Sequence, residues 1–386
     1  MNKSNTEKKA RVIAYYLPQF HPVDINDKYW GKGFTEWTNV AKAKPIFKDH
    51  YQPQIPADLG FYDLRMPEVR KAQADMAKEY GIEGFCYWHY WFGNGETILD
   101  MPIKEVLSSK EPDFPFCLGW ANHSWSNRTW KRNKMYEKDI VFLEQKYLGE
   151  EDYKKYFYSV LPYFKDKRYI CVDDKPLFLI YAPQDIPDTE KFINLWNNLA
   201  VENGLNGIHF VARVSAIGNL KRLKSKKVLL SETEQRYKEY LNKGYDAIAS
   251  TTLSRADLCT GGLFSKIFKL ILERIGISAI PDIHDYRKVI KYLYTDEDRW
   301  ENVYPQLVPR WDKTPRMGKG AHIYKNSSPE YFKKSIEYAL EHIEKKDDEH
   351  KILFAFAWNE WGEGAYLEPD IKYGKGYLEA IKKSIM

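Results

Sequence analysis

Cysteine is scarce in this sequence, and long apolar runs are missing from it. The four cysteines form no Cys-x-x-Cys pair, and Cys86 and Cys117 lie inside apolar runs typical of small core residues. No stretch is apolar over enough residues to cross a bilayer. Residues 1–12 are polar and charged, and they lack the apolar segment of a secretory signal. These features predict a reduced, cytoplasmic protein.

An excess of charge of one sign is also lacking. Lysine and arginine number 59 and aspartate and glutamate 54, so the net charge is only +5 in 386 residues. This surplus is too small and too evenly spread to predict a nucleic-acid partner. A hydrophobic content of 44% is ample for a core, which argues against disorder. The length allows one large domain or two ordinary ones.

Aromatic residues, in contrast, are abundant. They make up 16% of the chain and include 29 tyrosines and 12 tryptophans. Many of them stand in clusters beside polar residues. Aromatic rings stack on the C–H faces of sugars while neighbouring polar groups bind the hydroxyls, so the clusters indicate a carbohydrate ligand. A core that happens to be rich in tyrosine is the alternative.

Short apolar runs alternate with longer helical patterns along the chain. The expected strands are 11–17, 82–92, 114–121, 175–183, 207–213, 245–250, 303–311 and 351–358. The expected helices are 67–81, a segment near 97–109, 150–165, 188–204, 328–346 and 374–386. Eight strands that alternate with helices predict an α/β fold of the (β/α)₈ TIM-barrel type.

We expect this barrel to occupy residues 11–386 as a single domain with elaborated loops at its C-terminal face, after a polar tail of residues 1–10. An open, doubly wound sheet is the second possibility. Such a sheet usually carries a glycine-rich phosphate-binding turn after its first strand, and none follows residues 11–17 here.

Polar and aromatic clusters follow most of the expected strands. They are Tyr16, Gln19 and His21 in or after the first strand, Trp88, His89 and Tyr90 at the second, Trp120, Asn122 and His123 at the third, Arg213 at the fifth, Arg310, Trp311 and Asp312 at the seventh, and Asn359, Trp361 and Tyr366 after the eighth. Barrel enzymes assemble their sites at the C-terminal ends of the strands. We therefore predict that these residues bind substrate.

Two glutamates, Glu360 and Glu363, follow the last strand in a glycine-rich stretch with tryptophans. Two neighbouring carboxylates among indoles do not both ionise easily, so one is expected to keep a proton as an acid while the other acts as a base. Glycosidic-bond chemistry uses such a pair. The alternative is that Glu363 is a loop carboxylate bound to an arginine.

Five stretches, "WNEWGEGAYLEPD", "YYLPQFHP", "GFTEWTNV", "GFCYWHYWF" and "LGWANHSW", together resemble the WbsX-type glycosyltransferases of bacterial surface-polysaccharide clusters. The chain is also similar to glycoside hydrolase family 99, whose members are endo-acting α-mannosidases and mannanases on a (β/α)₈ barrel. The resemblance runs from about residue 11 to the C-terminus and is thinnest across 216–300.

The resemblance implies a retaining mechanism without a protein nucleophile. Glu360 would take the proton from the sugar 2-hydroxyl, which attacks the anomeric carbon and forms a 1,2-anhydro sugar. Glu363 would protonate the leaving oxygen and then deprotonate the incoming water. Tyr16 would line the site.

Other readings remain open. Transfer to an acceptor competes with hydrolysis, and a non-catalytic carbohydrate-binding barrel is a further alternative. The acidic run Asp296–Asp298 is interpreted as a solvated turn and not as a nucleotide-sugar motif. The segment 263–276 could contact a membrane and present a lipid-linked saccharide, but an outer barrel helix is favoured. No metal or other cofactor is expected, since the histidines show no HxH or HExxH spacing.

Overall fold

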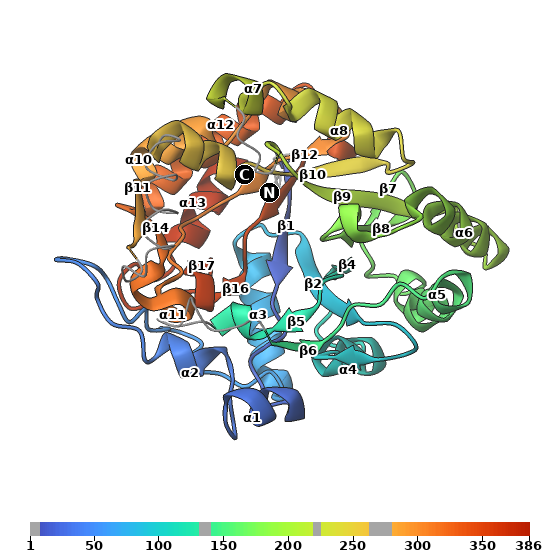
Figure 1. Ribbon diagram of the computed structural model, residues 1–386, viewed down its shortest axis with the longest axis horizontal. Coiled ribbons are helices and arrows are strands. Elements are labelled where there is room, and N and C mark those ends of the chain that lie inside the picture. The colour runs from blue at the N-terminus through green and yellow to red at the C-terminus, as the bar shows by residue number, and fades with distance from the viewer. Residues whose placement is uncertain (1–7, 131–139, 219–224, 262–279) are drawn as a thin grey trace, which may run out of the picture.

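The computed structural model describes residues 8–130, 140–218, 225–261 and 280–386 (Figure 1). Its barrel strands, in the order of the sheet, are β1 (Arg11–Tyr16), β2 (Gly84–Trp91), β4 (Phe116–Trp120), β8 (Lys175–Ile180), β9 (His209–Ser215), β10 (Ala247–Thr251), β12 (Val303–Tyr304) with β13 (Gln306–Leu307), and β15 (Ile352–Ala355). All of these pairings are parallel. The eight predicted strands are therefore present.

The seventh strand position closes the barrel. β12 pairs with β10, β13 pairs with β15, and only Pro305 separates the two short strands. Proline has no N–H to donate, but the Pro305 carbonyl still accepts a hydrogen bond from the backbone N–H of Phe354 at 3.0 Å. The predicted (β/α)₈ fold is confirmed. The strand expected at 303–311 is shorter than predicted and ends at Leu307.

The strands are buried on both faces, as in other parallel sheets. All eight residues of β2 are buried. In its register with β4 the Trp88 ring lies against Gly119, where an added Cβ would approach the ring to 3.0 Å. The Trp88 ring also stacks on Tyr15 of β1, with ring centroids 4.8 Å apart. Large rings in the barrel therefore depend on a small residue in the neighbouring strand.

An outer ring of helices surrounds the strands (Figure 1). These helices are α3 (Pro67–Glu79), α4 (Met101–Ser109), α5 (Glu150–Phe164), α6 (Thr189–Glu202), α7 (Lys226–Leu230), α8 (Thr233–Leu241), α12 (Pro329–Ile343) and α13 (Gly376–Ile385). The helix α12 shows why they pack inward, because Phe332, Ile336, Ala339 and Ile343 form one buried stripe at helical spacing. The helix predicted near 97–109 begins only at Met101.

Shorter elements decorate the barrel. They are the helices α1 (Asp24–Trp30), α2 (Glu36–Val40), α10 (Tyr286–Val289) and α11 (Thr314–Met317), the strands β3 (Thr97–Ile98), β5 (Trp125–Ser126), β6 (Val141–Leu143), β7 (Cys171–Val172), β11 (Asp282–Asp285), β14 (His322–Lys325), β16 (Asn359–Glu360) and β17 (Ala365–Tyr366), and the 3₁₀ turns η1 (Asn127–Trp130), η2 (Pro183–Asp185), η3 (Ile290–Tyr292), η4 (Asp296–Arg299), η5 (Gly318–Gly320), η6 (Asp348–His350) and η7 (Trp361–Glu363). Most of the site described below lies on these elements.

Cys86 and Cys117 are fully buried, as predicted. The acidic run differs from the expectation of a solvated turn, because Asp298 is fully buried and accepts hydrogen bonds from the Ser250 hydroxyl at 2.6 Å and from the backbone N–H of Thr295 at 2.7 Å. Asp298 thus caps the turn η4.

No helix within the described residues is long and apolar enough to cross a membrane. The predicted amphipathic segment 263–276 lies outside the described residues, as do residues 1–7 of the predicted tail.

Candidate active site

A cavity of about 550 Å³ opens at the C-terminal ends of the barrel strands. The predicted site residues that line it are Gln19, Trp88, Tyr90, His123, Arg213, Trp311, Glu360 and Glu363. The cavity therefore brings together residues from six loops or strand ends that are far apart in the sequence. Its position agrees with the general location of active sites in barrel enzymes.

A tight turn after β15 positions Glu360 and Glu363. Glu360 ends β16, Glu363 ends the turn η7, and β17 then pairs antiparallel with β16. Gly364 has a φ of +58°, and a Cβ there would lie within 2.9 Å of the Asp312 backbone. The backbone N–H of Asp312 donates to the Glu363 carbonyl at 2.7 Å. Glycine is therefore required where the turn meets the loop after β13.

One arginine joins three carboxylates at the cavity. Arg316 lies 2.5 Å from Glu360 and 2.7 Å from Glu36 through Nη2, and 2.8 Å from Glu363 through Nη1. Lys313 adds a second cation, with its Nζ 2.9 Å from Glu363 Oε1. The helices α2 and α11, which carry Glu36 and Arg316, pack against each other and against the turn η7, which carries Glu363.

Gly362 makes this approach possible. A Cβ at that position would lie 2.6 Å from Glu36 Oε2 and 2.9 Å from Arg316 Nε. Glu36 is fully buried, and Glu360 is only 5% exposed. The spacing Glu-x-Gly-Glu thus serves a site whose third carboxylate comes from the loop after β1.

The two predicted catalytic glutamates differ in protonation. Burial raises the pKa of Glu360 to about 8; Arg316 opposes the shift, and the carboxylates of Glu363 and Glu36 add to it. Burial also acts to raise the pKa of Glu363, but Lys313 and Arg316 outweigh it and lower that pKa below its usual value. At neutral pH the free site therefore keeps a proton on Glu360 and a charge on Glu363.

This order is the reverse of the one that the resemblance implies, in which Glu363 donates the first proton. The cause is the distribution of cations, because among the residues that the structure describes both Lys313 and Arg316 form ion pairs with Glu363, whereas Arg316 alone pairs with Glu360. The alternative in which Glu363 binds an arginine is also realised in part. The ion pair does not remove Glu363 from the cavity, since the residue still lines it.

Aromatic rings form much of the remaining wall. Trp30, Trp125, Trp130 and Phe142 line the cavity together with Tyr181. The first four come from α1 and from the segment around β5, η1 and β6. Such rings offer flat apolar faces to a saccharide.

Two polar side chains stand beside Tyr181. The guanidinium of Arg213 lies over the Tyr181 ring at 4.5 Å, and the ring centroids of His123 and Tyr181 are 5.0 Å apart. Burial, together with the charges of Arg213 and Arg316, lowers the pKa of His123 to about 4. A neutral imidazole and a fixed cation are therefore available to a ligand on this side.

Several residues predicted to bind substrate lie outside the cavity wall. The hydroxyl of Tyr16 donates to Gln73 at 2.7 Å, and the Trp120 indole N–H donates to the Trp91 carbonyl at 3.1 Å. Asn122 bonds to both backbone groups of Ala182 at 2.8 Å. The polar groups of these side chains are hydrogen-bonded to other parts of the protein. These residues therefore stabilise the strand ends and do not offer contacts to a sugar.

His21 and His89, which were also predicted to bind substrate, do not line the cavity. The ring of His89 lies 3.0 Å from the Tyr156 hydroxyl of α5, and burial lowers the pKa of His89 to about 4. His21 is 4% exposed and does not line the cavity. Successive residues of a strand face opposite sides, so His89 lies on the other side of β2 from Trp88 and Tyr90, which line the cavity.

Arg310 and Asp312, predicted after the seventh strand, also lie outside this cavity. Arg310 pairs with Asp370 at 2.6 Å and lies between the rings of Tyr366 and Tyr377 at 3.9 and 4.2 Å. Asp312 lies 2.8 Å from His50, and these two residues border a separate cavity of about 800 Å³ that Arg310 also lines.

The three remaining predicted residues, Asn359, Trp361 and Tyr366, stabilise the turn that carries Glu360 and Glu363. Asn359 bonds to both backbone groups of Leu17 at 2.8 and 3.0 Å, and Trp361 stacks on Tyr366 with centroids 3.6 Å apart. The Trp361 indole donates to Glu368 at 2.6 Å.

Sequence analysis missed Glu36, Lys313, Arg316 and the rings of Trp30, Trp130 and Phe142. Glu36 does lie in one of the stretches that carried the resemblance, "GFTEWTNV", which was the available signal. No sequence motif distinguishes Lys313 or Arg316 from other charged residues in the segments that connect barrel strands and helices.

Comparisons with known proteins agree with this architecture. The model of a family described as Glycosyltransferase WbsX matches residues 12–381. The protein WxcX of Xanthomonas campestris pv. campestris strain B100 is 33% identical over 97% of this chain, and the chain spans about half (50%) of the length of that relative.

Among solved structures, a glycoside hydrolase family 99 endo-alpha-mannosidase from Bacteroides thetaiotaomicron superposes with a TM-score of 0.54 at 14% identity, covering 97% of this chain and 95% of that one. A glycoside hydrolase-like protein superposes with a TM-score of 0.61 at 12% identity, covering 100% and 96%. At these identities the likeness shows a shared fold.

Proposed function

Because this chain belongs to the WbsX glycosyltransferase family, we propose that it acts on glycosidic bonds of a surface polysaccharide or of its precursor. The observation that carries the proposal is the pair Glu360 and Glu363, which face one aromatic-lined cavity with opposite protonation. Breaking or forming a glycosidic bond needs one group that gives a proton and one that takes it.

The proposed chemistry is retaining and uses no protein nucleophile. A base removes the proton of the sugar 2-hydroxyl, O2 forms a bond to C1, and the bond from C1 to the leaving oxygen breaks as the acid protonates that oxygen. Water or an acceptor hydroxyl then attacks C1 and opens the 1,2-anhydro sugar. The carboxylate that gave its proton to the leaving oxygen takes the proton of this hydroxyl, and the other carboxyl group returns its proton to O2. A mannose-like residue is the proposed substrate unit, on the strength of the resemblance.

The resemblance assigns the base to Glu360 and the acid to Glu363, whereas the free site keeps its proton on Glu360. One proton shared by a coupled pair supports either assignment, since the total charge is the same. Substrates with an activated leaving group distinguish them. Such a leaving group needs no protonation, so it restores turnover only to the variant that lost the acid.

The first experiment compares wild-type protein with Glu360→Gln and Glu363→Gln on α-mannan and on oligosaccharides, with new reducing ends as the readout. Each variant should lower kcat by about 10²- to 10⁴-fold while its melting temperature changes little, because general acid–base catalysis has this magnitude. Glu379→Gln, on the exposed side of α13, is the matched control. Full activity in both active-site variants would disprove the assignment.

Transfer is the second candidate function, and the description of the family as glycosyltransferases favours it. The same reactions with an added oligosaccharide acceptor, analysed by mass spectrometry, separate the two. Products heavier than the acceptor indicate transfer. Binding of saccharide without any turnover would instead support the non-catalytic barrel.

A further inference from the structure

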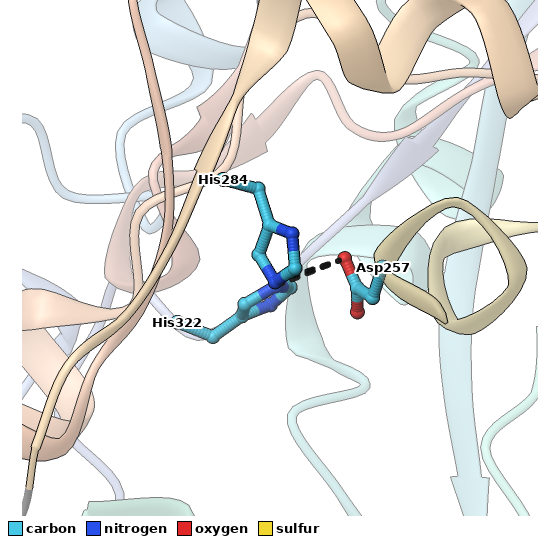
Figure 2. A group of neighbouring side chains, drawn as sticks. All are labelled: Asp257, His284 and His322. Carbon is cyan, nitrogen blue, oxygen red and sulfur yellow. Dashed lines mark hydrogen bonds and ion pairs between the residues drawn. The ribbon is translucent and has the colours of Figure 1, made fainter. Parts of the chain in front are cut away.

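Two histidines and two aspartates meet beside the barrel, away from the glutamate pair. His284 lies in β11, His322 begins β14, and Asp257 lies in the helical residues 253–261 (Figure 2). One ligand atom from each of these three residues lies within 4.8 Å of the other two. Asp282, at the start of β11, adds a second carboxylate 3.2 Å from His284.

The distances suit a tetrahedral site of the zinc type. Zinc bonds of about 2.1 Å at tetrahedral angles place neighbouring ligand atoms about 3.4 Å apart. Asp257 Oδ1 lies 3.1 Å from His322 Nε2 and 3.9 Å from His284 Nε2, and Asp282 Oδ1 lies 3.2 Å from His284 Nε2. The Tyr324 hydroxyl donates to Asp257 Oδ1 at 2.8 Å and so orients that carboxylate.

The hydrogen bonds around His284 determine which ring nitrogen carries a proton. The Thr260 hydroxyl donates its single proton to the Ala256 carbonyl at 2.9 Å. Thr260 therefore accepts from His284 Nδ1, which lies 2.6 Å away. In the neutral ring the proton is then on Nδ1, and the Nε2 lone pair points at the oxygens of Asp282 and Asp257. This lone pair and the carboxylate oxygens are donor atoms of the kind that a metal ion binds.

The cluster is partly enclosed. The His284 side chain is 2% exposed and that of Asp257 10%, whereas His322 is 20% and Asp282 28% exposed, which leaves a side open for an ion to enter. A Cβ on Gly261 would lie 2.6 Å from His284 Cε1, so a glycine allows the helical segment to approach the ring this closely. The cluster is a built and partly enclosed site.

We propose that Asp257, His284 and His322 bind one divalent transition-metal ion of the Zn²⁺ class, with Asp282 beside His284. Imidazole and carboxylate ligands in a tetrahedral arrangement favour zinc over magnesium or calcium, which prefer six or more oxygen ligands. The ion ties the helical residues 253–261 to the parallel pair of β11 and β14.

This pair of strands lies next to the loop that carries the active-site cations. The backbone N–H of Lys313 donates to the His322 carbonyl at 3.1 Å, and that of Tyr324 donates to the Trp311 carbonyl at 2.8 Å. Arg316 lies in the stretch of chain between Lys313 and His322, whose ends these two hydrogen bonds join. The metal is therefore structural, and its ligands brace the segment that positions Lys313 and Arg316 against the glutamates.

The experiment uses the full chain without an affinity tag, stripped with EDTA and then dialysed against Zn²⁺. Mass spectrometry of the metal content should find one zinc per chain, and zinc should raise the melting temperature of the stripped protein. His284→Gln and Asp257→Asn should each lower zinc affinity by at least about 10-fold, as loss of even a supporting contact does. His342→Gln, which changes a partly exposed histidine of α12, should bind zinc as the wild type does.

A spectrum of the wild-type protein tests the proposal independently of variants that fail to fold. Co²⁺ in place of Zn²⁺ should give the intense visible absorption of a tetrahedral site, and added Zn²⁺ should abolish it. A stripped wild-type protein that binds less than about one-tenth of an equivalent of zinc overturns the proposal. So does equal zinc binding by wild type and His284→Gln.

Discussion

Replacement of Lys313 by methionine tests how cations divide the proton between the two glutamates. The Lys313 ammonium lies 2.9 Å from Glu363 Oε1, and the two side chains are 30% and 13% exposed. An opposite charge within about 4–6 Å of a carboxylate typically lowers its pKa by about 1–3 units. Since Arg316 remains and Lys313 is partly exposed, we expect the pKa of Glu363 to rise by about 1 unit, or about 1.4 kcal/mol.

The pH dependence of kcat/KM reports the ionisation of the free enzyme. In the wild type we expect a bell with its acidic limb set by the lowered pKa of Glu363 and its basic limb near the pKa of about 8 of Glu360. Lys313→Met should move the acidic limb to higher pH and move the basic limb in the same direction by less, because Lys313 forms an ion pair with Glu363 and acts more weakly on the pKa of Glu360. This result does not depend on which glutamate is the acid.

The matched control is Lys333→Met, which removes the same charge from an exposed pair on α12. Its pH profile should superpose on that of the wild type. An acidic limb that stays in place in Lys313→Met, or an equal shift in the control, would show that the cation beside Glu363 does not set its ionisation.

Two further predictions concern the support and the wall of the site. Glu368 accepts hydrogen bonds from Tyr62, Gln73 and Trp361, and burial raises its pKa to about 7. Because the folded protein holds this proton more tightly than the unfolded chain, wild-type stability should fall as pH rises from about 4.5 to about 7, by up to about 3 kcal/mol, and urea unfolding of Glu368→Gln should lack this part of the slope. An identical slope in both proteins would contradict the shift. Trp30→Ala, which removes one aromatic ring of the cavity, should raise KM about 10-fold with kcat nearly unchanged, whereas Trp300→Ala outside the cavity should change neither value. A loss confined to kcat would place Trp30 in the chemical step.

Local patterns were sufficient for the fold. Apolar runs of strand length, most of them followed by a helical pattern, predicted the eight strand positions, and the helix boundaries of α5 and α6 agree within one or two residues. These signals are local, because each run must bury its own apolar face. The sequence also shows Pro305 within the seventh strand position. Its role in closing the barrel depends on the pairing of β12 with β10 and of β13 with β15, which the sequence does not show.

The candidate site was predictable only in part. Glu360 and Glu363 were found because they directly follow a strand whose end the barrel places at the cavity. Glu36 and Arg316 come from two other loops, and the sequence of neither loop predicts that the two side chains form an ion pair. Arg310 was expected to line the cavity with the two glutamates. It instead forms an ion pair with Asp370 and lines the separate cavity beside His50 and Asp312.

The sequence by itself thus determined the barrel, the position of the glutamate pair and an aromatic surface suited to saccharide, since these depend on neighbours along the chain. Only the tertiary structure decided which glutamate keeps the proton, because Lys313 and Arg316 reach Glu363 across the cavity. It also brought Asp257, His284 and His322 together. Charges and metal ligands act over a few ångströms in space, whatever their separation in the chain.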